Sequence, residues 1–239
     1  MKKLTVEAVE RLAGKFRTEA QLSQFEPLNC HSVLQSKNVL TVFRPLSANV
    51  GGVSIMSPDR RWRYMLVNSS RPIGRQRFTI AHELYHLFYD DNLEPHLCFE
   101  DNGHKNPREA SADLFASALL MPKDGIISNI PDDELRRNQI SLATIMRLEQ
   151  YFGVSHQALC YRLKRLKLIN ESYLQQLLAI SPSRTAWEFG YSTKIYDDGD
   201  GRKTVLGDFI AKAKVLFDEE RISEGHYMEL MNLVDDGES

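Results

Sequence analysis

Apolar residues recur along the chain with two different periods, and these periods predict its secondary structure. Between residues 4 and 22 they return at helical spacing, as on the buried face of a helix. A second short helix is expected at about 28–37, after Pro27. The period then changes in three short runs rich in β-branched and aromatic residues and separated by turn residues, at 39–46, 52–56 and 62–67. These runs predict a small antiparallel sheet.

The rest of the pattern is mainly helical. One helix is expected from about residue 70 to Tyr89, and another over 107–121, with a proline at its entry and another just after it. The segment 93–107 between them contains prolines, a glycine and little periodicity, so we expect a loop. Further helices are expected at about 131–137, 141–152, 155–166, 171–180, 205–219 and 223–234.

The character of the sequence changes near Asn170. We therefore divide the chain into a larger domain at 1–169 and a small, mainly helical region at 170–239. The polar stretch 181–204 ends in a turn-rich run of aspartates and glycines, which lacks the terminal glutamate of a calcium loop. We interpret that run as a turn.

Composition and charge exclude several classes of protein. The 239 residues carry a formal net charge of −2 and are 42% hydrophobic, which is typical of a globular protein and does not require nucleic acid as a partner. The longest apolar stretch, Leu114–Met121, is far shorter than the roughly 18 residues that span a bilayer. The start of the chain has no apolar core of a signal peptide, so we expect a cytoplasmic protein without a membrane partner. The three cysteines, an odd and widely spaced set, are expected to be reduced.

The run His82-Glu83-Leu84-Tyr85-His86 is the strongest chemical signal. Histidines at i and i+4 lie on one face of a helix, so both rings can reach a single metal ion, and zinc accepts imidazole nitrogen. Glu83 is rotated around the helix, where it can act on the open side of the ion as a general base. The alternative is an amphipathic helix that carries two histidines by chance.

The next helix supplies two carboxylates that weigh against chance. Glu109 and Asp113 are also spaced i, i+4, among small residues that allow close helix packing. Catalytic zinc usually has three protein ligands and an open position, so Glu109 is the candidate third ligand. Asp113 is a candidate to accept the N–H of a ligating histidine and fix its tautomer. A solvated helix face would explain both residues otherwise, but the following run is almost wholly apolar and indicates a buried helix.

Residues 75–86 and 109–122, in this order, resemble the ImmA/IrrE family of zinc metallo-endopeptidases. The resemblance covers about residues 1–168. It implies an α+β fold, a minimal zincin of the thermolysin-like group with a small antiparallel sheet and a trailing helical hairpin, and Zn²⁺ as cofactor. It also implies that the third ligand is a glutamate, matched here by Glu109, and that Asp113 completes the family's Glu-x-x-x-Asp pattern.

The chemistry expected of such a site is peptide hydrolysis. Zinc would polarise the scissile carbonyl while Glu83 takes a proton from water and later returns it to the leaving amine. By analogy with zincins, the strand at 62–67 is expected to pair with an extended substrate. Candidate oxyanion stabilisers are Tyr85, Tyr89 and His104, although an ordinary packing role is the favoured explanation for each of them.

Cys98 lies twelve residues after His86, in the expected loop between the two ligand helices. A thiolate is a strong zinc ligand, so one hypothesis is that Cys98 occupies the fourth position and holds the enzyme inactive. The alternative, which the sequence alone favours, is a buried or idle loop cysteine.

Residues 141–168 contain two helical patterns joined at Gly153-Val154-Ser155, which resembles a helix-turn-helix with a basic end. Binding of DNA is one interpretation. We favour a packed hairpin that completes the first domain, because the chain as a whole is not basic.

These features favour a zinc endopeptidase. The family resemblance implies that its substrate is a helix-turn-helix repressor, whose cleavage derepresses genes of a DNA-damage response or of a phage-related or mobile element. The alternatives are a non-catalytic zinc-containing DNA-binding regulator and a toxin–antitoxin component. The oligomeric state stays open.

Overall fold

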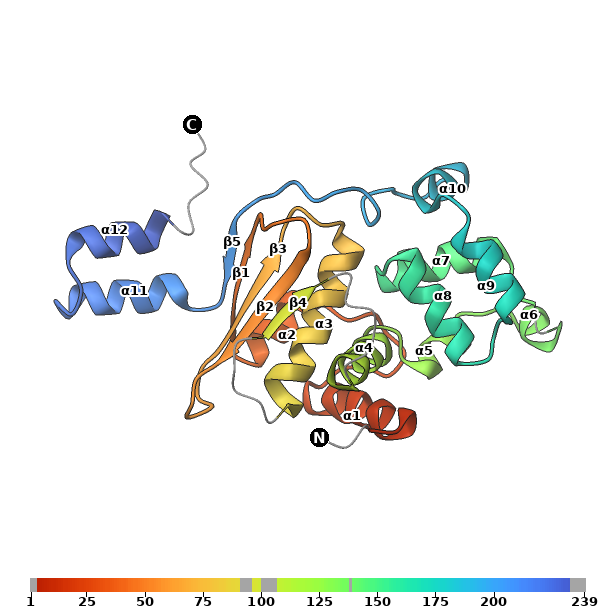
Figure 1. The fold of residues 1–239 in the computed structure, drawn as a ribbon, viewed down its shortest axis with the longest axis horizontal. Coiled ribbons are helices and arrows are strands. Elements are labelled where there is room, and N and C mark those ends of the chain that lie inside the picture. Colours follow the sequence, from red (N-terminus) through yellow and green to blue (C-terminus); the bar gives the residue numbers. More distant parts are fainter. Residues whose placement is uncertain (1–3, 91–95, 100–106, 138, 233–239) are drawn as a thin grey trace.

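The computed structural model describes residues 4–90, 96–99, 107–137 and 139–232. A five-stranded sheet lies in the middle, with α3 (Ile73–Tyr89) across one face. Helices α4 (Pro107–Leu120) and α1 (Val6–Glu19) pack in turn beyond α3 (Figure 1). This arrangement confirms the predicted α+β class.

The sheet is mixed, with the strand order β4-β2-β3-β1-β5. Its strands are β1 (Val39–Arg44), β2 (Val50–Met56), β3 (Arg63–Asn68), β4 (His96–Phe99) and β5 (Thr204–Leu206). The prediction that the first three runs form an antiparallel sheet is wrong in one pairing, because β1 and β3 are parallel. The hairpin of β2 and β3 folds back so that β3 lies between β2 and β1. The consecutive strands β1 and β2 are therefore not neighbours.

Two further expectations about this sheet are wrong. The segment 93–107 is not wholly a loop, since residues 96–99 form β4 and pair antiparallel with β2 at the sheet edge. The strand at 62–67 cannot pair with a substrate, because β3 is bonded to β2 on one side and to β1 on the other. The sequence does not predict β4, because four residues are too few to show the alternation of a strand among the surrounding turn residues.

The core of the first domain is formed by the helices against the sheet. Val9, Ala13 and Phe16 bury one face of α1, and Ala112 and Ala116 of α4 have no exposed surface. Such small side chains allow α4 to lie close to both α1 and α3. Helix α2 (Cys30–Ser36) begins at Asn29, whose side chain accepts a hydrogen bond from the Ser32 amide, and packs near β1.

A group of shorter helices follows α4 and lies on one side of the molecule (Figure 1). They are α5 (Lys123–Ser128), α6 (Asp132–Arg137), α7 (Leu142–Phe152), α8 (His156–Arg165), α9 (Glu171–Leu178) and α10 (Pro182–Glu188). The predicted hairpin is α7 and α8, with Ser141 and Ser155 as N-caps. Gly153 ends α7 at a φ of 63°, a left-handed conformation that glycine adopts without strain.

The C-terminal part of the described chain returns to the sheet. β5 pairs antiparallel with β1, and α11 (Phe209–Asp218) and α12 (Glu224–Asn232) then form a helical pair on the opposite side from α5–α10 (Figure 1). The boundary at 170 stays a prediction. None of the helices within the described ranges is long and apolar enough to cross a membrane.

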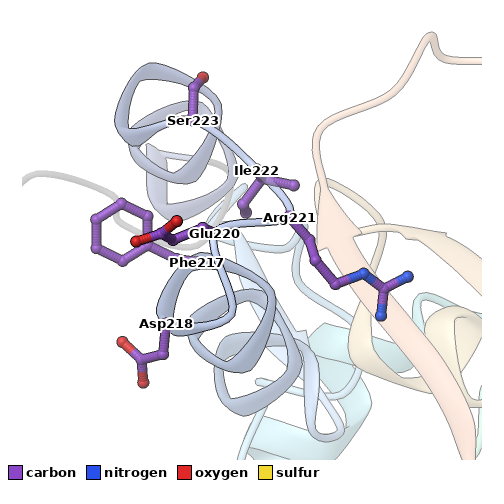
Figure 2. Close-up of a pocket in the computed structure, with 6 residues that line it drawn as sticks. All are labelled: Phe217, Asp218, Glu220, Arg221, Ile222 and Ser223. Atoms are coloured by element: carbon purple, nitrogen blue, oxygen red, sulfur yellow. The ribbon is translucent and has the colours of Figure 1, made fainter.

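A surface hollow lies where α11 ends and the connection to α12 begins (Figure 2). It is lined by residues 217, 218 and 220–223, and Phe217 stacks on Tyr227 at 4.7 Å between ring centroids. None of the predicted site residues lies there.

Candidate metal centre

Helix α3 places His82 and His86 one turn apart on a buried face. Both residues are 4% exposed, and their Nε2 atoms lie 3.2 Å from each other. The helix periodicity alone produces this juxtaposition, as the sequence predicts.

Glu109 of α4 approaches the same point. Its Oε2 lies 3.2 Å from Nε2 of His82 and 3.8 Å from Nε2 of His86. Neighbouring ligand atoms of a tetrahedral zinc ion are about 3.3 Å apart, given bond lengths of about 2.0–2.1 Å. The three donor atoms therefore have the chemical types and the mutual spacing that such an ion requires.

Each histidine is oriented by a carboxylate on its other ring nitrogen. Nδ1 of His82 lies 2.9 Å from Oδ1 of Asp113, the partner that the sequence predicts. Nδ1 of His86 lies 2.9 Å from Oδ2 of Asp90, a residue that the sequence interpretation missed. A proton on each Nδ1 leaves each Nε2 with its lone pair toward the shared point, which is the tautomer that binds metal.

Asp90 could have been found, because it follows His86 by four residues, the same spacing that joins the two histidines. It is 2% exposed, and its Oδ2 also accepts from Nε of Arg108 at 2.6 Å. Arg108 immediately precedes Glu109, so this ion pair connects the end of one candidate ligand helix with the beginning of the other.

The candidate base, Glu83, is fully buried. Its Oε2 accepts a hydrogen bond from the hydroxyl of Ser54 on β2 at 2.5 Å. The sequence gives no signal for this contact, because Ser54 is 29 residues away and belongs to a different element. The contact fixes the carboxylate on the side of α3 that faces the sheet.

The site is strongly anionic around its imidazoles. Burial lowers the pKa of His82, but its hydrogen bonds with Asp113 and Glu109 and the charge of Glu83 outweigh burial and raise the pKa to about 10. Surroundings that hold a proton so tightly also favour a metal cation in its place.

Comparison with known proteins agrees with this geometry. Residues 34–164, more than half of the chain, match the peptidase M78 family, described as the IrrE N-terminal-like domain. The chain belongs to this family. The radiation response metalloprotease IrrE of Deinococcus radiodurans is 28% identical over 150 residues. That alignment covers 57% of this chain and 40% of the relative, so the chain spans less than half of the relative's length.

The M78 family match includes the segments of α3 and α4 between which the metal-binding side chains converge. All the residues of the candidate metal centre lie inside the matched range.

The C-terminal end of α4 is fixed by two fully buried arginines. Arg17 of α1 donates to the carbonyl of Leu119 at 2.6 Å, and Arg162 of α8 donates through Nε to the carbonyl of Met121 at 3.0 Å. Arg162 also forms an ion pair with both oxygens of Glu10. Carbonyls at a helix C-terminus lack partners within the helix, so these two cations anchor the helix that carries Glu109.

The basic end of the α7–α8 hairpin makes contacts within the protein. Arg162, one of the residues of its basic end, is buried and engaged with Glu10, and Lys164 lies 3.1 Å from Glu171. Arg165 and Lys167 of the same end are exposed. The choice between a packed hairpin and a DNA-binding helix-turn-helix stays a prediction.

Two of the candidate oxyanion stabilisers lie within the described residues, and the ring of one, Tyr85, is 5.6 Å from that of His86. Tyr85 is fully buried, and its ring lies 5.7 Å from that of Phe115. Tyr89 also packs on Phe115, at 5.3 Å, and burial raises its pKa to about 12. His104 lies outside the described residues. The identity of the oxyanion stabiliser stays a prediction.

Cys98 is brought to the centre by β4. Within the described part of the chain, two groups of side chains have donor atoms within 4.8 Å of one another, as a metal ion requires. One is His82, His86 and Glu109, and the other is His82, Glu83 and Cys98. The thiol therefore shares one histidine with the three-residue set.

Proposed function

We propose that this protein is a zinc endopeptidase in which His82, His86 and Glu109 hold the ion and Glu83 is the general base. The observation that carries the proposal is the convergence of three donor atoms at tetrahedral spacing beside a buried glutamate. A structural zinc site needs no base and usually has four protein ligands, so this arrangement favours catalysis.

In this mechanism zinc, when bound, polarises the scissile carbonyl and makes water acidic enough to lose a proton near neutral pH. Glu83 accepts that proton and passes it to the leaving amine. Ser54 keeps the Glu83 carboxylate in one orientation by donating its hydroxyl. Asp113 and Asp90 keep both imidazoles in the metal-binding tautomer.

The ligand assignment is tested by metal content. We expect the protein to bind one zinc per chain, and Glu109→Gln and His86→Ala to lower its zinc affinity by at least a hundredfold. The exposed Glu188 provides a matched control, because Glu188→Gln changes a carboxylate far from the site. Full zinc affinity in Glu109→Gln would remove that residue from the ligand set.

We further propose that the substrate is a helix-turn-helix transcriptional repressor whose loss derepresses stress, phage-related or mobile-element genes. Support comes from the family resemblance, since regulatory proteases of this type are expected to cleave one partner. The test is incubation of zinc-loaded protein with the repressor encoded by the adjacent gene. A single cut, absent after zinc removal, supports the proposal, and an uncut repressor beside a cut control peptide contradicts it.

A further inference from the structure

A described side chain outside the three-residue ligand set also reaches the metal centre. Sγ of Cys98 lies within 4.8 Å of a ring nitrogen of His82 and of a carboxylate oxygen of Glu83. The thiol therefore lies beside the candidate base and beside one of the three candidate ligands, His82.

The backbone brings β4 to this point through two specific features. Cys98 pairs with Gly52 of β2, next to an irregularity in register between Val50 and Gly52. Such a bulge changes the direction of the side chains beside it and is common next to active sites.

Gly52 itself permits a close approach of strand and helix. A Cβ at this position would lie 2.7 Å from Cγ2 of Thr79, one turn before His82 on α3, and 2.8 Å from the carbonyl of Leu66. Only glycine therefore lets β2, and with it β4, lie so near the helix that carries the histidines.

Strand β2 positions both Glu83 and Cys98. Ser54 of β2 holds the carboxylate of Glu83, while Gly52, two residues earlier, is paired with Cys98. Both groups are thus positioned against α3 by one strand.

We propose that Cys98 is a fourth, inhibitory ligand of the zinc held by His82, His86 and Glu109. This inference rests on the proposed zinc site. Thiolate sulfur is a preferred zinc ligand, and zinc with four protein ligands is structural because no position is left for water or substrate. The thiol releases its proton to solvent when it binds the ion.

Release of the inhibition requires movement of β4 alone. This strand is an edge strand of the sheet, and its pairing with β2 covers only residues 96–99. Separation of that short pairing removes Cys98 and opens the coordination position, while α3 and α4 keep the three other ligands.

Cobalt substitution tests the ligand directly, without reference to activity. Co²⁺ bound to the full chain is expected to show a sulfur-to-cobalt charge-transfer band in the near ultraviolet. Cys98→Ala should lose the band and keep one cobalt per chain, while Cys30→Ala, which alters a buried cysteine of α2, should keep it. A wild-type protein with one bound cobalt and no such band would overturn the proposal.

Alkylation and cleavage provide two further readouts. Zinc should protect Cys98 from iodoacetamide, as measured by mass spectrometry, and an equal rate of modification with and without zinc contradicts the proposal.

Cys98→Ala should cleave a peptide library about tenfold faster than wild type. This factor is expected if Cys98 occupies the fourth position in roughly 90% of the wild-type molecules. If cleavage is unchanged, the inhibitory role fails while the zinc peptidase stands. If Glu83→Gln cleaves as well as its Glu83 parent in the Cys98→Ala background, the proposed function fails.

Discussion

Asp90 lies 2.9 Å from Nδ1 of His86 and is the carboxylate that fixes this ring for metal binding. The aspartate is the C-cap residue of α3, and Arg108 in the first turn of α4 donates to it from the other side. The orientation of one candidate ligand therefore depends on an ion pair between the two helices of the site.

Asp90→Asn should weaken zinc binding by roughly 10- to 100-fold, because the amide cannot stabilise the required tautomer as the carboxylate does. The measurement is competition with a chromophoric chelator. Asp133→Asn, at an exposed position of α6, is the control and should bind zinc as wild type does. Equal affinities of the two variants would refute the role of Asp90.

Ser54→Ala should lower kcat about tenfold and leave zinc affinity unchanged. The loss arises because the Glu83 carboxylate is no longer held in one orientation, whereas the three ligands are untouched. Steady-state kinetics and zinc titration on the same preparation separate the two effects. Ser32→Ala, an exposed serine of α2, is the matched control, and a Ser54→Ala variant with wild-type kcat would contradict this prediction.

The sequence predicts the candidate ligands well because their spacing is set within single helices. His82 and His86 lie one turn apart whatever the rest of the fold does, and the same spacing relates Glu109 to Asp113. Ser54 and Cys98 reach the site through strand pairing, which depends on which strands become neighbours and is not encoded in any short motif. The parallel pairing of β1 with β3 was mispredicted for the same reason.

Arg162→Met should destabilise the fold by about 3 kcal/mol. The substitution removes the buried cation that anchors α4 at Met121 and leaves Glu10 without its bidentate partner. Urea unfolding of the zinc-loaded protein measures the loss. Arg165→Met changes an exposed arginine three residues along the same helix and should cost less than about 0.5 kcal/mol. Similar losses in both variants would show that Arg162 is not an anchor.

A buried ion pair predicts a pH dependence of stability. Nδ1 of His156 lies 2.6 Å from Glu149, which also accepts the hydroxyl of Tyr196 at 2.8 Å. Burial lowers the pKa of His156, but contacts with Cys160 and Glu149 outweigh it and raise the pKa to about 10.

The pKa of His156 in the folded protein lies above its value of about 6.5 in the unfolded chain. Protonated His156 therefore makes its full contribution to the free energy of unfolding below about pH 6.5, and this contribution is lost as the pH rises toward 10. The free energy of unfolding of zinc-loaded protein should therefore fall between about pH 7 and 10, and His156→Gln should flatten the profile. His226→Gln, a histidine of α12 outside this pair, should keep the wild-type slope. An unchanged slope in His156→Gln contradicts the assignment.

The central claim is that Glu83 is the base of a zinc peptidase. Its most direct test is to measure bound zinc and cleavage of a peptide library side by side for wild type and Glu83→Gln, each also in the Cys98→Ala background. The account predicts one zinc per chain in every protein and cleavage lowered at least about a hundredfold by Glu83→Gln. Cleavage that persists in Glu83→Gln with full zinc content would contradict it.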